Sequence, residues 1–226
     1  MALYSISPLQ PIDLYCERLG PAFWAEPVNA VSNLAFVLAA LWAWAEARKH
    51  PPVPVVLNLL IALGGAIGVG SFLFHTFANT WSEWADVVPI WSFVALYVLT
   101  AIHMVGGVAP GRVLRIGAAV GAVLVVVFLA TGSQPAAPSP PVLNGSLQYA
   151  PALIALAVFA GITWRRRHPM APWAGAAALS FLVSLIFRTI DLGVCASLPV
   201  GTHFLWHILN GLMVALLLQA LVRNRL

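Results

Sequence analysis

Long apolar runs recur along this chain, and they limit what it can fold into more than any other feature. A helix that crosses a bilayer needs about 20 mostly apolar residues. Charged residues make up only 8% of the 226 residues, against about 25% in a typical soluble domain, so the chain cannot cover a water-facing surface. We therefore expect an all-α integral membrane protein, a single seven-helix domain over residues 1–226 in which residues 1–27 form an extracytoplasmic N-terminal segment. The expected spans are Val28–Ala47, Val53–His75, Trp84–Val105, Arg112–Thr131, Val142–Trp164, Ala171–Leu192 and Gly201–Val222.

Basic residues occur in every second loop, and this alternation predicts the orientation of the chain. The loops near Asn79, Gln134 and Ser197 contain no Lys or Arg. Because basic loops stay in the cytoplasm, we expect the N-terminus outside and the C-terminus inside. The basic residues form small clusters rather than a stripe, so we expect the bilayer, and not nucleic acid, as a partner. The clusters comprise Arg48, Lys49, Arg112, Arg115, Arg165, Arg166, Arg167, Arg223 and Arg225.

Polar residues within the apolar runs gather at the expected outer ends of the spans. His75 ends the second span, Asp86 begins the third, and His203 and His207 open the seventh. Ionisable side chains are costly inside a membrane and are functional candidates by default. The sequence therefore predicts one polar site just beneath the outer surface.

His203 and His207 are candidate metal ligands. Residues four apart on a helix share one face, so the two imidazoles can hold one zinc ion. Such a pair also arises by coincidence, and its spacing alone does not separate the two interpretations. With His75, the pair would supply three neutral nitrogen ligands. A catalytic zinc keeps three protein ligands and leaves the fourth position to a water that ionises near neutral pH.

Ser71 and Asp86 are candidate catalytic residues beside this metal. Ser71 lies one helical turn before His75, and Asp86 follows it after a short loop, at the start of an antiparallel helix. Asp86 could act as the base for the water, and Ser71 could donate a hydrogen bond to a developing oxyanion. Two other interpretations stay open: Ser71 as a packing residue and Asp86 as a helix N-cap.

These residues resemble the motifs of the alkaline ceramidase family, within a wider superfamily of seven-span hydrolases. Ser71-x3-His75-x10-Asp86 and His203-x3-His207 match its site motifs, and Gly68–His75 reads GVGSFLFH, close to a family signature. The segments Tyr15-Cys16-Glu17 and Glu26–Asn33 resemble its N-terminal block, and Asp191-x3-Cys195 matches a further position. The resemblance covers most of the chain, although the middle spans match only in hydrophobicity.

The resemblance implies a zinc-dependent amidase that cleaves ceramide to a long-chain base and a fatty acid. It assigns zinc to His75, His203 and His207, catalytic roles to Ser71 and Asp86, and a disulfide to Cys16 and Cys195. Eukaryotic members also bind calcium near the N-terminus, where Glu17, Glu26 and Asp13 are the candidate ligands. Asp13 stands one residue early, Leu19 replaces an asparagine, and the loop before Glu26 is two residues shorter. Calcium needs six to eight oxygens, so ion pairs Glu17–Arg18 or Glu26–Arg188 remain an alternative.

Two further functions compete with ceramide hydrolysis. A hydrolase that cleaves an acyl ester of a glycolipid or phospholipid would have the same metal site. A receptor of the progestin and adiponectin type also has seven spans and a zinc held by three histidines. Those receptors have the opposite orientation, with the zinc in the cytoplasm, so the basic loops favour an enzyme.

Overall fold

The computed structural model describes residues 7–131 and 142–224, and every regular element in these two ranges is a helix. Residues 1–6, the loop around Gln134, and Arg225 lie outside them. The only paired extended residues in the described part are Pro11 and Asn79, which form an isolated bridge. The helices are α1 Pro27–Ser32, α2 Leu34–Ala47, α3 Val55–Phe77, α4 Thr80–Met104, α5 Pro110–Thr131, the 3₁₀ helix η1 Val142–Tyr149, α6 Ala150–Arg165, α7 Ala171–Val194 and α8 His203–Arg223.

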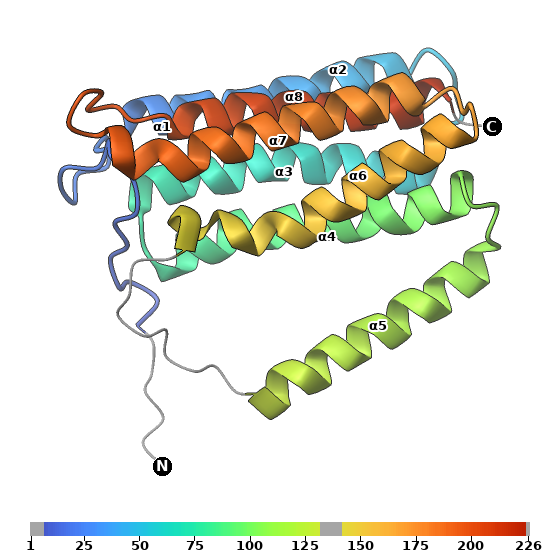
Figure 1. Cartoon of the computed structure of the whole chain (residues 1–226), viewed down its shortest axis with the longest axis horizontal. Coiled ribbons are helices and arrows are strands. Elements are labelled where there is room, and N and C mark those ends of the chain that lie inside the picture. The colour runs from blue at the N-terminus through green and yellow to red at the C-terminus, as the bar shows by residue number, and fades with distance from the viewer. Residues whose placement is uncertain (1–6, 132–141, 225–226) are drawn as a thin grey trace.

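Six helical stretches among the described residues are long and apolar enough to cross a membrane. They confirm a multi-pass helical protein and coincide with six of the seven predicted spans. The predicted fourth span, Arg112–Thr131, is helical as part of α5 but is not among the six. This helix contacts α4 and diverges from the remaining bundle (Figure 1).

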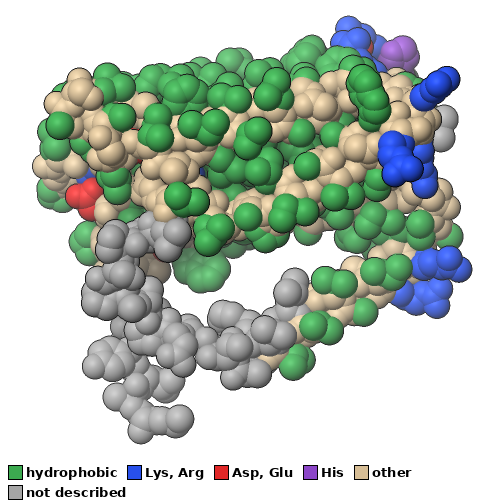
Figure 2. All heavy atoms as spheres, in the orientation of Figure 1, with side chains coloured by type: hydrophobic (Ala, Val, Ile, Leu, Met, Phe, Trp, Pro, Cys, Tyr) green, Lys and Arg blue, Asp and Glu red, His purple; other side chains and the backbone are tan. Residues whose placement is uncertain are grey.

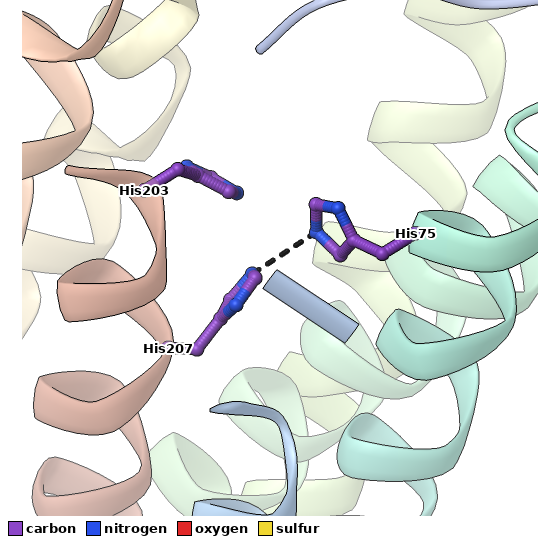
Figure 3. Close-up of side chains that lie close together, drawn as sticks. All are labelled: His75, His203 and His207. Carbon is purple, nitrogen blue, oxygen red and sulfur yellow. Dashed lines mark hydrogen bonds between the residues drawn. The ribbon is translucent and has the colours of Figure 1, made fainter. Parts of the chain in front are cut away.

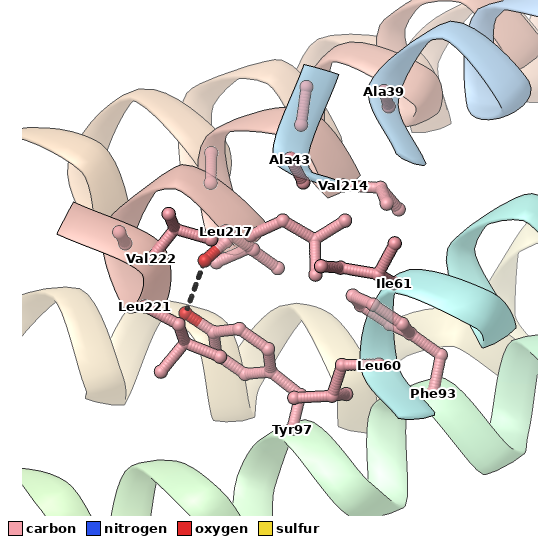
Figure 4. Close-up of a cluster of buried hydrophobic side chains, with 14 of the residues drawn as sticks. Ala39, Ala43, Leu60, Ile61, Phe93, Tyr97, Val214, Leu217, Leu221 and Val222 are labelled. Atoms are coloured by element: carbon pink, nitrogen blue, oxygen red, sulfur yellow. Dashed lines mark hydrogen bonds between the residues drawn. The ribbon is translucent and has the colours of Figure 1, made fainter. Parts of the chain in front are cut away.

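Helix α8 lies at the centre of the bundle and contacts α2, α3 and α7. About two thirds of its apolar window, 67%, is inside the protein, while Ile208 and Leu212 on its outer face are exposed. Val214 and Leu217 meet Leu60 and Phe93 in the core, where the Tyr97 hydroxyl donates to the Leu217 carbonyl at 3.2 Å (Figure 4). These contacts pack the C-terminal half of α8 against α3 and α4.

The connection between α3 and α4 is short and closely specified. Ala78 ends α3 in the left-handed region (φ 42°), and Asn79 caps α4 through a reciprocal bond with Ser82. Helix α4 therefore begins four residues earlier than the predicted Trp84. Asp86 lies in its second turn, so the interpretation of Asp86 as the N-cap is wrong.

The N-terminal segment folds across the end of the bundle at this connection. The Ile12 amide donates to the Ala78 carbonyl at 2.8 Å, and the Trp81 amide donates to the Pro8 carbonyl at 3.1 Å. A disulfide between Cys16 and Cys195 joins the segment to the end of α7, with Cα atoms 5.3 Å apart. The pairing implied by the family resemblance is therefore confirmed, and it closes this end of the bundle.

The basic residues gather at the other end of the bundle, where the C-terminus lies (Figures 1 and 2). The loops after α2, α4 and α6 are all at this end and carry the predicted basic clusters. The basic loops thus lie at one end of the bundle, and His75, His203 and His207 lie at the other.

Candidate metal centre

Three histidines converge where the C-terminal end of α3 meets the N-terminal end of α8. His75 comes from the last turn of α3, and His203 and His207 occupy successive turns on one face of α8 (Figure 3). Each offers a ring nitrogen, and these nitrogens all lie within 4.8 Å of one another. All three side chains are at most 2% exposed. Among the described residues this is the only group of three or more His, Cys, Asp or Glu side chains arranged to bind a metal ion.

Hydrogen bonds to the outer ring nitrogens set the tautomers of two of these histidines. His75 Nδ1 lies 2.6 Å from the Glu26 carboxylate, an acceptor, so this nitrogen carries the proton. His207 Nδ1 lies 2.7 Å from the Ser32 hydroxyl, whose own proton goes to the Asn29 carbonyl. The hydroxyl must therefore accept, and His207 is also protonated at Nδ1.

The inner nitrogens of these two rings consequently face each other as unprotonated acceptors. His75 Nε2 and His207 Nε2 are 3.1 Å apart (Figure 3). Two neutral imidazoles cannot hydrogen-bond through two lone pairs, whereas a cation bound by both resolves the repulsion. Partners that orient the second nitrogen are the usual companions of metal-binding histidines. The donor set therefore fits a metal ion with a preference for nitrogen.

His203 is positioned by residues whose roles the sequence patterns did not reveal. Its ring stacks on Tyr15 with centroids 3.6 Å apart, and its buried Nδ1 has no protein partner. Asp191 Oδ1 accepts from the amides of Thr202 and His203 at 2.6 and 2.9 Å, which fixes the start of α8. Gly201 adopts φ +68°, and a Cβ there would lie 2.2 Å from that carboxylate oxygen. Glycine is needed because the backbone approaches Asp191 so closely.

Ser71 and Asp86 lie together on the wall of a cavity that also reaches His203 and His207. The Ser71 side chain lies beside the Asp86 carboxylate, whose buried Oδ1 has no hydrogen-bond partner among the described residues. Close packing of α3 on α4 brings them together, since a Cβ on Gly70 would lie 2.0 Å from the Ala85 carbonyl oxygen. The structure thus joins both predicted catalytic residues to the histidine group.

This cavity is an apolar channel that extends from the histidines toward the basic end of the bundle. Its volume is about 410 Å³, and its walls come mainly from α4, α6, α7 and α8. On α4 alone the lining residues run from Asp86 to Val105, which at 1.5 Å per residue is about 28 Å. Such a channel accommodates one long hydrocarbon chain with its polar end at the histidines.

The three candidate calcium ligands do not form a calcium site. Asp13 is exposed to solvent. Both oxygens of Glu17 accept from the amides of Val28 and Asn29, at 2.7 and 2.8 Å. Burial raises the pKa of Glu17, and these two bonds oppose that shift. The carboxylate is thus used to cap α1, and the expected Glu17–Arg18 pair is absent.

Glu26 already holds a cation that the chain itself supplies. The Arg18 guanidinium pairs with Glu26 Oε1 and also donates to the Gly20 and His75 carbonyls, at 3.1 and 2.9 Å. Burial alone would raise the pKa of Glu26, but its hydrogen bond with His75 and the charge of Arg18 hold that pKa below its usual range. A calcium ion would have to displace this guanidinium, so the residues present do not fit calcium. The alternative Glu26–Arg188 pair is also wrong, because Glu26 pairs with Arg18 and Arg188 bonds Tyr15.

The sequence motifs contain Glu26, Ser32 and Asp191, but they do not reveal what these residues do. Glu26 and Ser32 belong to the N-terminal motif block, yet only the structure shows that they orient His75 and His207. Asp191 was visible as a motif position without a function. Tyr15 stacks its aromatic ring on His203, a contact that the motif Tyr15-Cys16-Glu17 did not indicate.

Comparison with known proteins places this arrangement in a family. A family model described as Ceramidase matches residues 15–225, which is nearly the whole chain. A search of curated proteins finds no match. The matched range contains all three histidines, Ser71, Asp86 and the disulfide. The chain therefore belongs to the ceramidase family.

Proposed function

We propose that this protein is a zinc-dependent intramembrane amidase that cleaves ceramide, or a closely related N-acyl lipid, to a long-chain base and a fatty acid. The family supports hydrolysis of an amide in a lipid. The observation that carries the proposal is the pair of facing, unprotonated nitrogens of His75 and His207, buried with His203 at the head of a chain-length apolar cavity.

Zinc is the metal that suits this donor set. Three neutral imidazoles with a position left for water are the usual catalytic zinc environment, and imidazole is a poor ligand for magnesium or calcium. When bound there, zinc would lower the pKa of a water molecule and polarise the amide carbonyl.

The remaining chemistry is assigned to two side chains at the cavity wall. Asp86 takes a proton from the attacking water and later delivers it to the departing amine nitrogen, as one residue serving as base and then acid. Its unpartnered Oδ1 is the atom proposed to hold that proton. Ser71 donates a hydrogen bond to the negative charge that develops on the carbonyl oxygen. The apolar channel binds the acyl chain and excludes water from the reacting end.

We propose seven spans in one domain over residues 1–226, with α5 as the fourth span in addition to the six, the N-terminus outside and the site near the extracytoplasmic face. Two features support this orientation. The basic loops lie at the end of the bundle opposite His75, His203 and His207, and basic loops face the cytoplasm. The disulfide Cys16–Cys195 lies at the histidine end, and disulfides persist in oxidising compartments outside the cytoplasm.

The test is a lipid-conversion assay on purified protein. The protein is incubated with mixed membrane lipids that contain ceramides and acyl esters, with and without a zinc chelator, and the consumed species are identified by mass spectrometry. We expect ceramides to decline and fatty acid to appear only without the chelator. The His203→Ala variant should lose bound zinc and activity, whereas His103→Ala, a control at the basic end, should keep both. Consumption of esters alone would assign the protein to lipid ester hydrolysis instead.

A further inference from the structure

Arg188 is a buried cation in the cavity wall that the proposed mechanism does not use. It lies on α7, is 6% exposed, and lines the same cavity as Asp86 and His203. No carboxylate of the described residues forms a salt bridge with it. Its Nη1 donates to the Tyr15 hydroxyl at 2.9 Å, while its buried Nε–H has no acceptor.

Aromatic rings compensate part of the cost of burying this charge. The guanidinium carbon lies 5.4 Å from the ring centroids of Tyr149 and Trp206 and 5.7 Å from that of Tyr15. Ring faces attract a cation, but a buried charge remains costly unless an anion pairs with it. Asp86, on the same cavity wall, interacts with this charge but forms no salt bridge with it. The unused Nε–H donor therefore indicates that an anion from outside the chain belongs beside the guanidinium.

The position of Arg188 places that anion at the reacting end of the cavity. Tyr15 contacts both Arg188 and the histidine group. Its hydroxyl accepts a hydrogen bond from Arg188, and its ring stacks on His203 with centroids 3.6 Å apart. The other cavity-lining arginine, Arg166, is exposed and directly follows α6 at the basic end of the bundle. An occupant is therefore an amphiphile with a long apolar chain and one anionic group at the histidine end.

We propose that Arg188 forms a subsite for the carboxylate of a long-chain fatty acid whose alkyl chain occupies the apolar channel. The planar edge of a guanidinium matches the two oxygens of a carboxylate. The inference deepens the proposed function, because amide hydrolysis converts a neutral carbonyl into such a carboxylate at this end of the cavity. The subsite would retain the fatty acid product after the amine leaves.

The test compares binding of palmitate and hexadecanol, two amphiphiles of equal chain length that differ in head group charge, to the purified full-length protein. Charge-assisted hydrogen bonds contribute about 10- to 100-fold in affinity, so palmitate should bind tighter by that factor. Measurements with and without a zinc chelator distinguish the contribution of Arg188 to palmitate affinity from the contribution of a bound metal ion. In the presence of chelator, the preference for palmitate should persist in wild type and in the control Arg166→Met, and should fall to about one in Arg188→Met.

Variant integrity is checked through thermal unfolding and zinc content. Replacing a buried charge by an apolar side chain of similar size is often tolerated. Arg188→Gln, which can still hydrogen-bond Tyr15, carries the test if the Met variant does not fold. An unchanged preference for palmitate in a folded Arg188 variant would overturn the subsite. Hexadecyl phosphate binding more tightly than palmitate, with the same dependence on Arg188, would overturn the fatty-acid assignment in favour of a phosphate headgroup.

The outcome for this subsite is distinguishable from that for ceramide hydrolysis. If ceramide is not cleaved but the palmitate preference depends on Arg188, the subsite stands and the proposed function fails. If ceramide is cleaved but palmitate binds no better than hexadecanol, the proposed function stands and the subsite fails.

Discussion

Replacing Glu26 by Gln tests whether this carboxylate orients the metal site. Glu26 contacts three buried groups. It pairs with Arg18, accepts a hydrogen bond from His75 Nδ1 at 2.6 Å, and accepts one from the side-chain amide of Asn29 at 3.1 Å. Glutamine keeps the size of the side chain and removes its charge. The Arg18 guanidinium, 7% exposed, then loses its counterion inside the protein.

Two effects of different size should follow from this substitution. Removing one partner of a buried ion pair typically costs about 3–5 kcal/mol, so the variant should unfold at a clearly lower temperature or denaturant concentration. Loss of the partner that orients a metal-binding histidine typically lowers metal affinity about 10- to 100-fold, or roughly 1.4–2.7 kcal/mol. Zinc affinity is measured by competition with a chelator of known affinity, and stability by circular dichroism in detergent.

The control is Glu46→Gln, the same substitution in an ion pair at the opposite end of the bundle. Glu46 contacts Lys49 at 2.6 Å and Arg223 at 3.5 Å, and the Lys49 side chain is 63% exposed. Such exposed pairs contribute little, so this variant should match wild type in zinc affinity and stability. Wild-type zinc affinity in Glu26→Gln would refute the tautomer argument for His75, and wild-type stability would refute the structural role of the Arg18–Glu26 pair.

Further substitutions address catalysis, packing, the disulfide and calcium. Asp86→Asn should keep zinc and lower hydrolysis at least about 100-fold, since it cannot take a proton; loss of zinc would instead make Asp86 a ligand. Gly70→Ala places a methyl group against the Ala85 carbonyl and should destabilise the protein by about 1–3 kcal/mol. Activity should also fall, because α3 and α4 must move apart. An unchanged free energy of unfolding would contradict this packing. Purified protein denatured without reductant should show no reactive thiol. The Cys16→Ser variant should lose about 2–5 kcal/mol of folding stability, and its Cys195 thiol should react with a labelling reagent. A calcium-selective chelator should leave both the unfolding temperature and the hydrolysis rate unchanged, because Arg18 already pairs with the Glu26 carboxylate. A loss of activity that added calcium restores would refute this.

Local patterns in the sequence were sufficient for the fold class and for part of the site. Six predicted spans coincide with helices long and apolar enough to cross a membrane, because apolar run length is a local property. His203 and His207 share a helix face for the same reason, since helical periodicity depends only on spacing. The position of Asp86 was predicted one turn too early in its helix, because the Asn79–Ser82 capping box that starts α4 precedes the apolar run.

Only the tertiary structure decided what surrounds those residues. Glu26 lies 49 residues from His75 along the chain, and Ser32 lies 175 from His207. No local pattern specifies such contacts, because they depend on how α1, α3 and α8 pack together. For the same reason, it was packing that paired Arg18 with Glu26 and left Arg188 in the cavity wall without a salt bridge to any described residue. The sequence by itself determined a helical membrane protein with a polar site at one end. Which side chains orient the histidines, pair with Glu26 and line the apolar channel depended on contacts between segments that are distant along the chain.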